Sequence, residues 1–161
     1  MRRTLAPELS SGKDHTVFQH ILLPTDGSEP SKAAADAAIR FAAQVGARVT
    51  AVHVVPPLHM FTYEPEVTEH AHETYHRNRD ARARECLAPV EQLAQNAKVP
   101  CDTVMVEADD AYEGILATAH ERGCDLIAIG SHGRRGIAGA LLGSQTQKVL
   151  THSAIPVLVF R

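Results

Sequence analysis

Apolar residues gather in five short runs along the chain, at 17–24, 48–55, 103–106, 125–129 and 156–160. Each run is bounded by residues such as proline, glycine and aspartate, which break regular structure. The first run ends in near-continuous apolar residues, as is typical of a strand buried on both faces of a sheet, and the run at 48–55 is rich in β-branched residues. The pattern therefore predicts five strands.

The segments between these runs have helical patterns. Residues 31–45 are rich in alanine and place apolar side chains at helical spacing. Ser28 is positioned to cap this helix, Pro30 suits its first turn, and Gly46 stands where a left-handed C-cap belongs. Further helices are expected over about 68–96 with a kink or interruption near Pro89, from Asp109 or Asp110 to Gly123, and from Ser144 to about His152.

Strands and helices thus alternate along the whole chain. This alternation implies right-handed crossovers and a parallel sheet covered on both faces. The predicted fold class is a single doubly wound α/β domain with a five-stranded parallel sheet, over 17–161, preceded by a flexible tail at 1–16.

Composition argues against several classes of function. The chain has 161 residues, a net charge of −3 and 4% aromatic residues, so a broad basic field or stacking platforms for nucleic acid are not expected. No apolar run approaches the ~18 residues that a membrane helix needs. The N-terminus lacks the apolar core of a secretory signal, and no CxxC pair occurs among the three cysteines. We expect a cytoplasmic protein with reduced thiols that binds neither membrane nor nucleic acid.

Candidate chemistry lies where the predicted strands end, since ligands of open α/β sheets bind beyond the carboxyl ends of the strands. The most distinctive segment is the glycine-rich stretch 130–144. Its glycines allow successive amides to point into one concavity, Gly143 and Ser144 open a helix, and Arg134 and Arg135 add positive charge. GxxxxGK[ST] and GxGxxG are absent. Residue types alone therefore leave a phosphate cradle and an ordinary glycine-rich turn as equal alternatives.

The spacing Gly130-x2-Gly133-x9-Gly143-Ser144 resembles the nucleotide-binding signature of the universal stress protein family. Four collinear segments resemble other parts of that family, namely 21–28, 52–54, 125–133 and 156–159. The resemblance covers about 17–161 and implies a flavodoxin- or Rossmann-like, adenine-nucleotide-binding, usually dimeric cytosolic protein. It further implies a regulatory or sensor role in stress response.

The resemblance also assigns expected roles to residues. Asp26 would contact the ribose, the backbone of Val54 the adenine, and Gly130, Gly133, Gly143 and Ser144 the phosphates. The whole expected nucleotide-binding set is Pro24, Thr25, Asp26, Val54, Ile129, Gly130, His132, Gly133, Gly143, Ser144, Gln145 and Thr146. The implied ligand is ATP, or AMP or ADP, with Mg²⁺ as a further candidate held through the phosphates. A homodimer through the C-terminal strand is expected.

Two places in the chain depart from the family pattern. Ala108, Asp109 and Asp110 stand where a Gly-x-Pro turn is common, and the carboxylates of the two aspartates are expected to cap the next helix rather than hold a divalent metal. Gln145 stands where an apolar residue is frequent. No residue has the pattern of a dedicated general base for phosphoryl transfer, so any ATP hydrolysis is expected to be slow.

Ten histidines raise a metal hypothesis. His72-Glu73-Thr74-Tyr75-His76 spells HExxH, the helical zinc-hydrolase motif, but a histidine-rich chain spells it readily by chance. Adventitious metal capture by His70, His72 and His76 is the favoured interpretation, and His53 is expected to be a buried core residue. A zinc hydrolase, and a dimeric adaptor of the same fold without nucleotide, remain the alternative functions.

Overall fold

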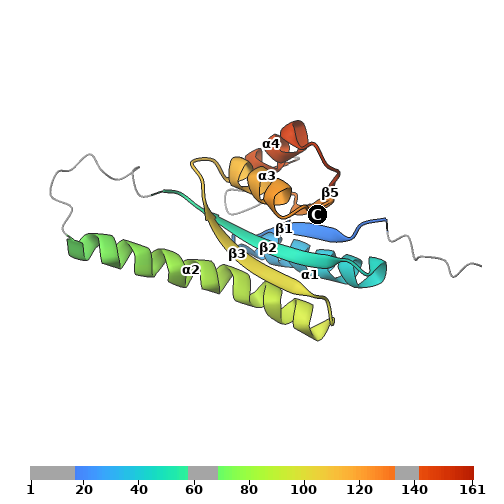
Figure 1. Ribbon diagram of the computed structural model, residues 1–161, viewed down its shortest axis with the longest axis horizontal. Coiled ribbons are helices and arrows are strands. Elements are labelled where there is room, and N and C mark those ends of the chain that lie inside the picture. The colour runs from blue at the N-terminus through green and yellow to red at the C-terminus, as the bar shows by residue number, and fades with distance from the viewer. Residues whose placement is uncertain (1–16, 58–68, 133–141) are drawn as a thin grey trace, which may run out of the picture.

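The computed structural model describes residues 17–57, 69–132 and 142–161 (Figure 1). Within these ranges the chain alternates between strand and helix from end to end. The strands are β1 (His20–Pro24), β2 (Arg48–Val55), β3 (Cys101–Glu107), β4 (Leu126–Gly130) and β5 (Val157–Phe160). The helices are α1 (Glu29–Val45), α2 (Glu69–Asn96), α3 (Ala111–Glu121) and α4 (Ser144–His152).

The strands form one parallel sheet in the order β3-β2-β1-β4-β5. Leu22 of β1 is opposite Thr50 of β2 and Ile127 of β4. Strands β2 and β3 lie on one side of β1 in the sheet, and β4 and β5 lie on the other side. The predicted doubly wound fold is confirmed. Its strand order is that of the first five strands of the Rossmann order 3-2-1-4-5-6 rather than the 2-1-3-4-5 order of flavodoxin.

Two hydrophobic layers cover the two faces of the sheet. Strand β1 has side chains in both layers, because successive side chains of a strand point to opposite faces. Ile21 and Leu23 pack with residues of α1 and α2, whereas Leu22 packs with Ile115 of α3 and Val149 of α4. Figure 1 shows α1 and α2 on one face and α3 and α4 on the other. All three β1 side chains are fully buried, which explains why the first apolar run lacks polar alternation.

The ends of α1 confirm the predicted caps. The Ser28 side chain accepts a hydrogen bond from the Ser31 amide, Pro30 lies in the first turn, and Gly46 has φ 69° with its amide bonded to the Ala42 carbonyl. Helix α2 is continuous from residue 69 to residue 96, with Pro89 inside it. Of the two predicted alternatives the interruption is therefore wrong, and the kink stays a prediction. None of the described helices is long and apolar enough to span a bilayer.

Candidate functional site

A cavity of about 410 Å³ opens at the carboxyl ends of β1, β2 and β4. This is where the strand order reverses, and its volume lies in the usual range for small-molecule sites. The lining residues are Pro24, Thr25, Asp26, Ser31, Val52, His53, Val54, Ala111, Ile115, Ile129, Gly130, His132, Gly143, Ser144, Gln145 and Thr146.

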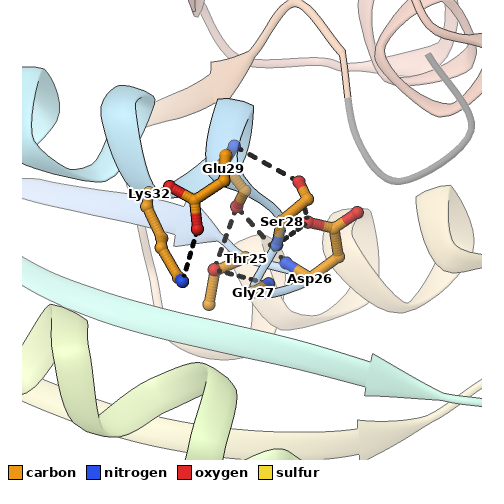
Figure 2. A network of polar contacts seen from close by, with 7 residues as sticks. Thr25, Asp26, Gly27, Ser28, Glu29 and Lys32 are labelled. Carbon is orange, nitrogen blue, oxygen red and sulfur yellow. Dashed lines mark hydrogen bonds and ion pairs between the residues drawn. The ribbon is translucent and has the colours of Figure 1, made fainter.

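The turn between β1 and α1 forms one wall of the cavity (Figure 2). Asp26 Oδ1 accepts hydrogen bonds from the backbone amide of Ser28 at 3.0 Å and from the Ser28 hydroxyl at 2.6 Å. Gly27 has φ 75°, and a Cβ added there would lie 2.7 Å from Cys86 Sγ. Glycine is therefore required at this position both by its backbone conformation and by its contact with α2.

The backbone amides of this turn donate hydrogen bonds to side chains of the turn and of the first turn of α1. The Asp26 amide donates to Ser31 Oγ at 3.3 Å, and the Gly27 amide donates to Thr25 Oγ1 at 3.3 Å. Ser31 Oγ in turn donates to Thr25 Oγ1 at 2.9 Å. With the Ser28 amide on Asp26, three successive amides are engaged, so the turn offers the cavity an acidic acceptor rather than an anion cradle.

The end of β2 forms the apolar wall together with α3 and β4. Val52 and Val54 line the cavity opposite side chains of Ile115 and Ile129. Helix α3 approaches β2 closely, since a Cβ added at Gly114 would lie 2.9 Å from Val54 Cγ1. These aliphatic side chains can enclose a flat, largely apolar group such as a nucleobase.

His53 also faces this cavity, although it is buried. Its Nδ1 lies 2.8 Å from the Thr25 carbonyl oxygen, and because a carbonyl only accepts, the ring donates from Nδ1. The expectation of a buried, hydrogen-bonded histidine is thus confirmed. The bond also ties the end of β1 to β2.

The start of α4 forms the opposite wall. The Gly143 amide donates to the Ser131 carbonyl at 2.7 Å, and the buried Thr146 hydroxyl donates to the Gly130 carbonyl at 2.8 Å. These bonds join α4 to the end of β4 on both sides of Ser144. The first amides of a helix have no intrahelical acceptor and lie at its positive end, so this wall can bind an anion.

His132 lies between the end of β4 and the start of the glycine-rich segment. It lines the cavity, and its Nδ1 is 3.1 Å from Ser131 Oγ. The next residues, Gly133, Arg134 and Arg135, fall outside the described residues. The expected phosphate contact of Gly133 stays a prediction.

Gln145 and Asp110 lie where α3 and α4 contact each other. Gln145 Oε1 accepts the Tyr112 amide at 2.9 Å, so this side chain caps α3. Asp110 occupies the N-cap position of α3 but makes no side-chain capping bond. Its carboxylate instead pairs with Lys148 Nζ at 3.2 Å. Asp110 thus holds the predicted N-cap position of α3, but its carboxylate makes no capping bond, and the side-chain amide of Gln145 from α4 accepts the Tyr112 amide instead.

The structure brings together eleven of the twelve expected residues around the cavity, and Gly133 is the one it does not describe. Five other lining residues were not in the expected nucleotide-binding set, namely Ser31, Val52, His53, Ala111 and Ile115. Of these, Ser31 carried a usable signal, since it follows Ser28 by one helical turn. The other four could not be recognised as lining residues, because their positions also fit the pattern of a strand or helix that packs in the core.

The HExxH segment lies on α2. Glu73 and His76 are described, whereas the side chains of His70 and His72 are not. Among the side chains that are described, no group of three or more metal-ligating residues occurs. The zinc and metal-capture hypotheses therefore stay untested predictions.

Known proteins resemble this chain in sequence and in fold. The profile of the universal stress protein family matches residues 18–161. A universal stress protein of Methanocaldococcus jannaschii is 33% identical over 145 residues, which are 90% of this chain and 83% of that protein. The structure of universal stress protein UspA from Lactobacillus plantarum is 25% identical with a TM-score of 0.73, covering 89% of this chain and 97% of that one.

A universal stress protein solved in complex with cAMP is also 25% identical, with a TM-score of 0.64, and the match covers 89% of this chain and 97% of that chain. The profile match, the curated relative and both structures agree over the region that carries the cavity. The chain belongs to the universal stress protein family.

Proposed function

We propose that this protein binds an adenine nucleotide, ATP or else AMP or ADP, and acts as a regulatory or sensor module in stress response in the cytoplasm. The single observation that carries the proposal is the cavity at the strand reversal, lined by an acidic turn, an apolar wall and a helix start. The complex of a relative with cAMP supports an adenine nucleotide as the ligand class.

The three walls fit the three parts of a nucleotide. Asp26 supplies an acceptor for ribose hydroxyls, and Val52, Val54 and Ile115 surround the base. The backbone of Val54 pairs with the adenine edge. The start of α4, from Gly143 to Thr146, receives the phosphates through its amides.

Hydrolysis of the nucleotide is expected to be slow. Asp26 is the sole carboxylate among the described lining residues, and its Oδ1 already accepts two hydrogen bonds from Ser28. A base for attack on a phosphate would have to lie near the helix start rather than in the β1–α1 turn. Mg²⁺ fits this site as an ion carried by the phosphates, because the described residues contain no cluster of metal ligands.

Calorimetric titration with ATP and Mg²⁺ tests the proposal. Wild-type protein should bind, and the combination Asp26→Ala plus Gly143→Val should weaken binding by at least about ten-fold, since one charge-assisted hydrogen bond contributes ~1.5–3 kcal/mol. The matched control is Asp36→Ala on α1, outside the cavity lining, where the carboxylate pairs with Arg40 at 2.8 Å. Unchanged affinity in the double variant would refute the site, and absence of binding to wild type would favour the nucleotide-free adaptor.

A further inference from the structure

Ser28 has two separable roles in the β1–α1 turn. Its hydroxyl oxygen accepts the Ser31 amide at 3.3 Å, which caps α1. The same hydroxyl donates to Asp26 Oδ1 at 2.6 Å, and the Ser28 amide adds a second bond to that oxygen at 3.0 Å. Figure 2 shows the hydroxyl of Ser28 directed at the Asp26 carboxylate. The first role serves the helix, whereas the second serves a carboxylate that lines the cavity.

The backbone under Asp26 is also held in place. Gly27 packs on Cys86 so closely that an added Cβ would lie 2.7 Å from its Sγ. On the other side, the buried Ser31 hydroxyl bridges the Asp26 amide and Thr25 Oγ1. With the backbone fixed, the remaining freedom of Asp26 is rotation of its side chain. The two bonds from Ser28 to one carboxylate oxygen restrict that rotation.

We propose that Ser28 is a positioning residue: it holds the Asp26 carboxylate in one orientation and thereby sets the preference of the cavity for ligands that carry ribose hydroxyls. This inference rests on the proposed function and names a specificity determinant within it. Ser28 acts through Asp26, because the cavity lining contains Asp26 but not Ser28. A carboxylate that is already oriented loses less side-chain entropy when it binds a hydroxyl group.

Substitutions can separate the two roles of Ser28. Ser28→Gly removes the hydroxyl donor but costs the helix little, since glycine is an accepted N-cap. Ser28→Ala removes the same donor without adding backbone freedom, and its melting temperature should fall by only about 3 °C. Ser28→Thr keeps a hydroxyl that can both cap α1 and donate to the Asp26 carboxylate. Glu29→Gln is the matched control in the same turn, because the Glu29 carboxylate pairs with Lys32 at 2.7 Å and not with the Asp26 network (Figure 2).

The experiment measures the affinity of each variant for ATP and for 2′,3′-dideoxy-ATP by calorimetry, with melting temperatures recorded in parallel. Wild type, Ser28→Thr and Glu29→Gln should bind ATP about ten-fold more tightly than the dideoxy analogue. In Ser28→Gly and Ser28→Ala this ratio should fall to about two-fold, with ATP binding weakened and dideoxy-ATP binding nearly unchanged. A merely structural role would lower both affinities together and leave the ratio intact.

The outcomes distinguish this inference from the proposed function. If both hydroxyl-free variants keep the wild-type ratio, or if wild type binds ATP without discriminating against the dideoxy analogue, the positioning role is refuted while nucleotide binding stands. If wild type binds neither nucleotide, the proposed function fails and this inference fails with it.

Discussion

At the scale of single residues, the turn that carries Asp26 depends on one glycine. Gly27 has φ 75°, and Gly123 at the end of α3 has φ 62°. A Cβ at Gly27 would meet Cys86 Sγ at 2.7 Å, whereas a Cβ at Gly123 would meet nothing within 4 Å. The two glycines therefore share a backbone requirement and differ in whether a neighbouring side chain also excludes a Cβ.

This difference predicts the stability of matched variants. Gly123→Ala should lower the free energy of unfolding by about 1 kcal/mol through backbone strain alone. Gly27→Ala should lower it by roughly 2–4 kcal/mol, because overpacking against Cys86 adds to the strain. Adding Cys86→Ala should recover part of the Gly27→Ala loss, as measured by urea denaturation. Equal losses for the two glycine variants would show that the contact with Cys86 has no energetic effect.

His20 is a second residue with a measurable role. It is buried in β1, and its Nε2 lies 2.8 Å from the Thr50 hydroxyl. Burial lowers the pKa of His20 below its ordinary value of 6.5, and the nearby Arg48 charge lowers that pKa further, while Asp125 and Asp102 act in the opposite direction. The folded chain thus holds His20 neutral under conditions where the unfolded chain begins to protonate it.

The pH dependence follows from this linkage. Below about pH 6.5 the unfolded state binds more protons at His20 than the folded state does, so this residue's contribution to stability falls as the pH falls toward its folded-state pKa. His20→Gln, which keeps a hydrogen-bonding group without titrating, should lose less stability than wild type between pH 7.5 and pH 5.5. Denaturant titrations at the two pH values measure the difference, and parallel losses in both proteins would contradict the assignment.

At the scale of elements, α3 and α4 are joined beside the cavity. Gln145 Oε1 accepts the Tyr112 amide, and Lys148 pairs with Asp110 while its Nζ lies 4.9 Å above the centre of the Tyr112 ring. The start of α4 is thus positioned both by β4, through Thr146, and by α3. The contacts between α3 and α4 thus connect the apolar wall of the candidate site to the wall formed by the start of α4.

Removing the Gln145 cap tests this support. Gln145→Ala should lower the free energy of unfolding by about 1 kcal/mol, because it leaves the Tyr112 amide at the start of α3 without its acceptor. The control is Gln147→Ala, which makes the same change at an exposed position of the same helix and should change stability by less than about 0.5 kcal/mol. Thermal denaturation compares the two. An equal effect at both positions would mean that only helix propensity changed.

At the scale of the whole molecule, β5 lies at one edge of the sheet, with partly buried apolar side chains from Val157 to Phe160. The Ile127 and Ser131 amides donate to the Pro156 and Phe160 carbonyls, so alternate residues of β5 bond to β4. By the same alternation, the backbone groups of Val159 point to the open side. An open apolar edge is a surface on which a second copy of the chain can pair.

We accordingly expect a homodimer through β5, measured by sedimentation equilibrium. Val159→Pro should raise the dimer dissociation constant, because it removes an outward-pointing amide while leaving the alternate amides that bond to β4. Circular dichroism checks whether the variant keeps its fold. A monomer mass at all concentrations of wild-type protein would contradict this expectation.

The sequence by itself determined the elements, the fold class and most of the cavity lining. Strands buried on both faces are continuous apolar runs, and the caps of α1 depend on residues within a few positions of each other, so local patterns suffice for both. The resemblance to the universal stress protein family supplied the expected ligand-binding set, and eleven of its members line the cavity because they lie at the carboxyl ends of strands or at the start of α4.

Only the tertiary structure decided which partner each polar side chain takes. Asp110 pairs with Lys148 and Gln145 caps α3, because both pairings join helices about 35 residues apart in the chain. The contact of Gly27 with Cys86 and the strand order β3-β2-β1-β4-β5 likewise depend on packing between distant segments. Local sequence fixes backbone conformation within an element, whereas the contacts between elements depend on the whole fold, and those contacts shape the cavity.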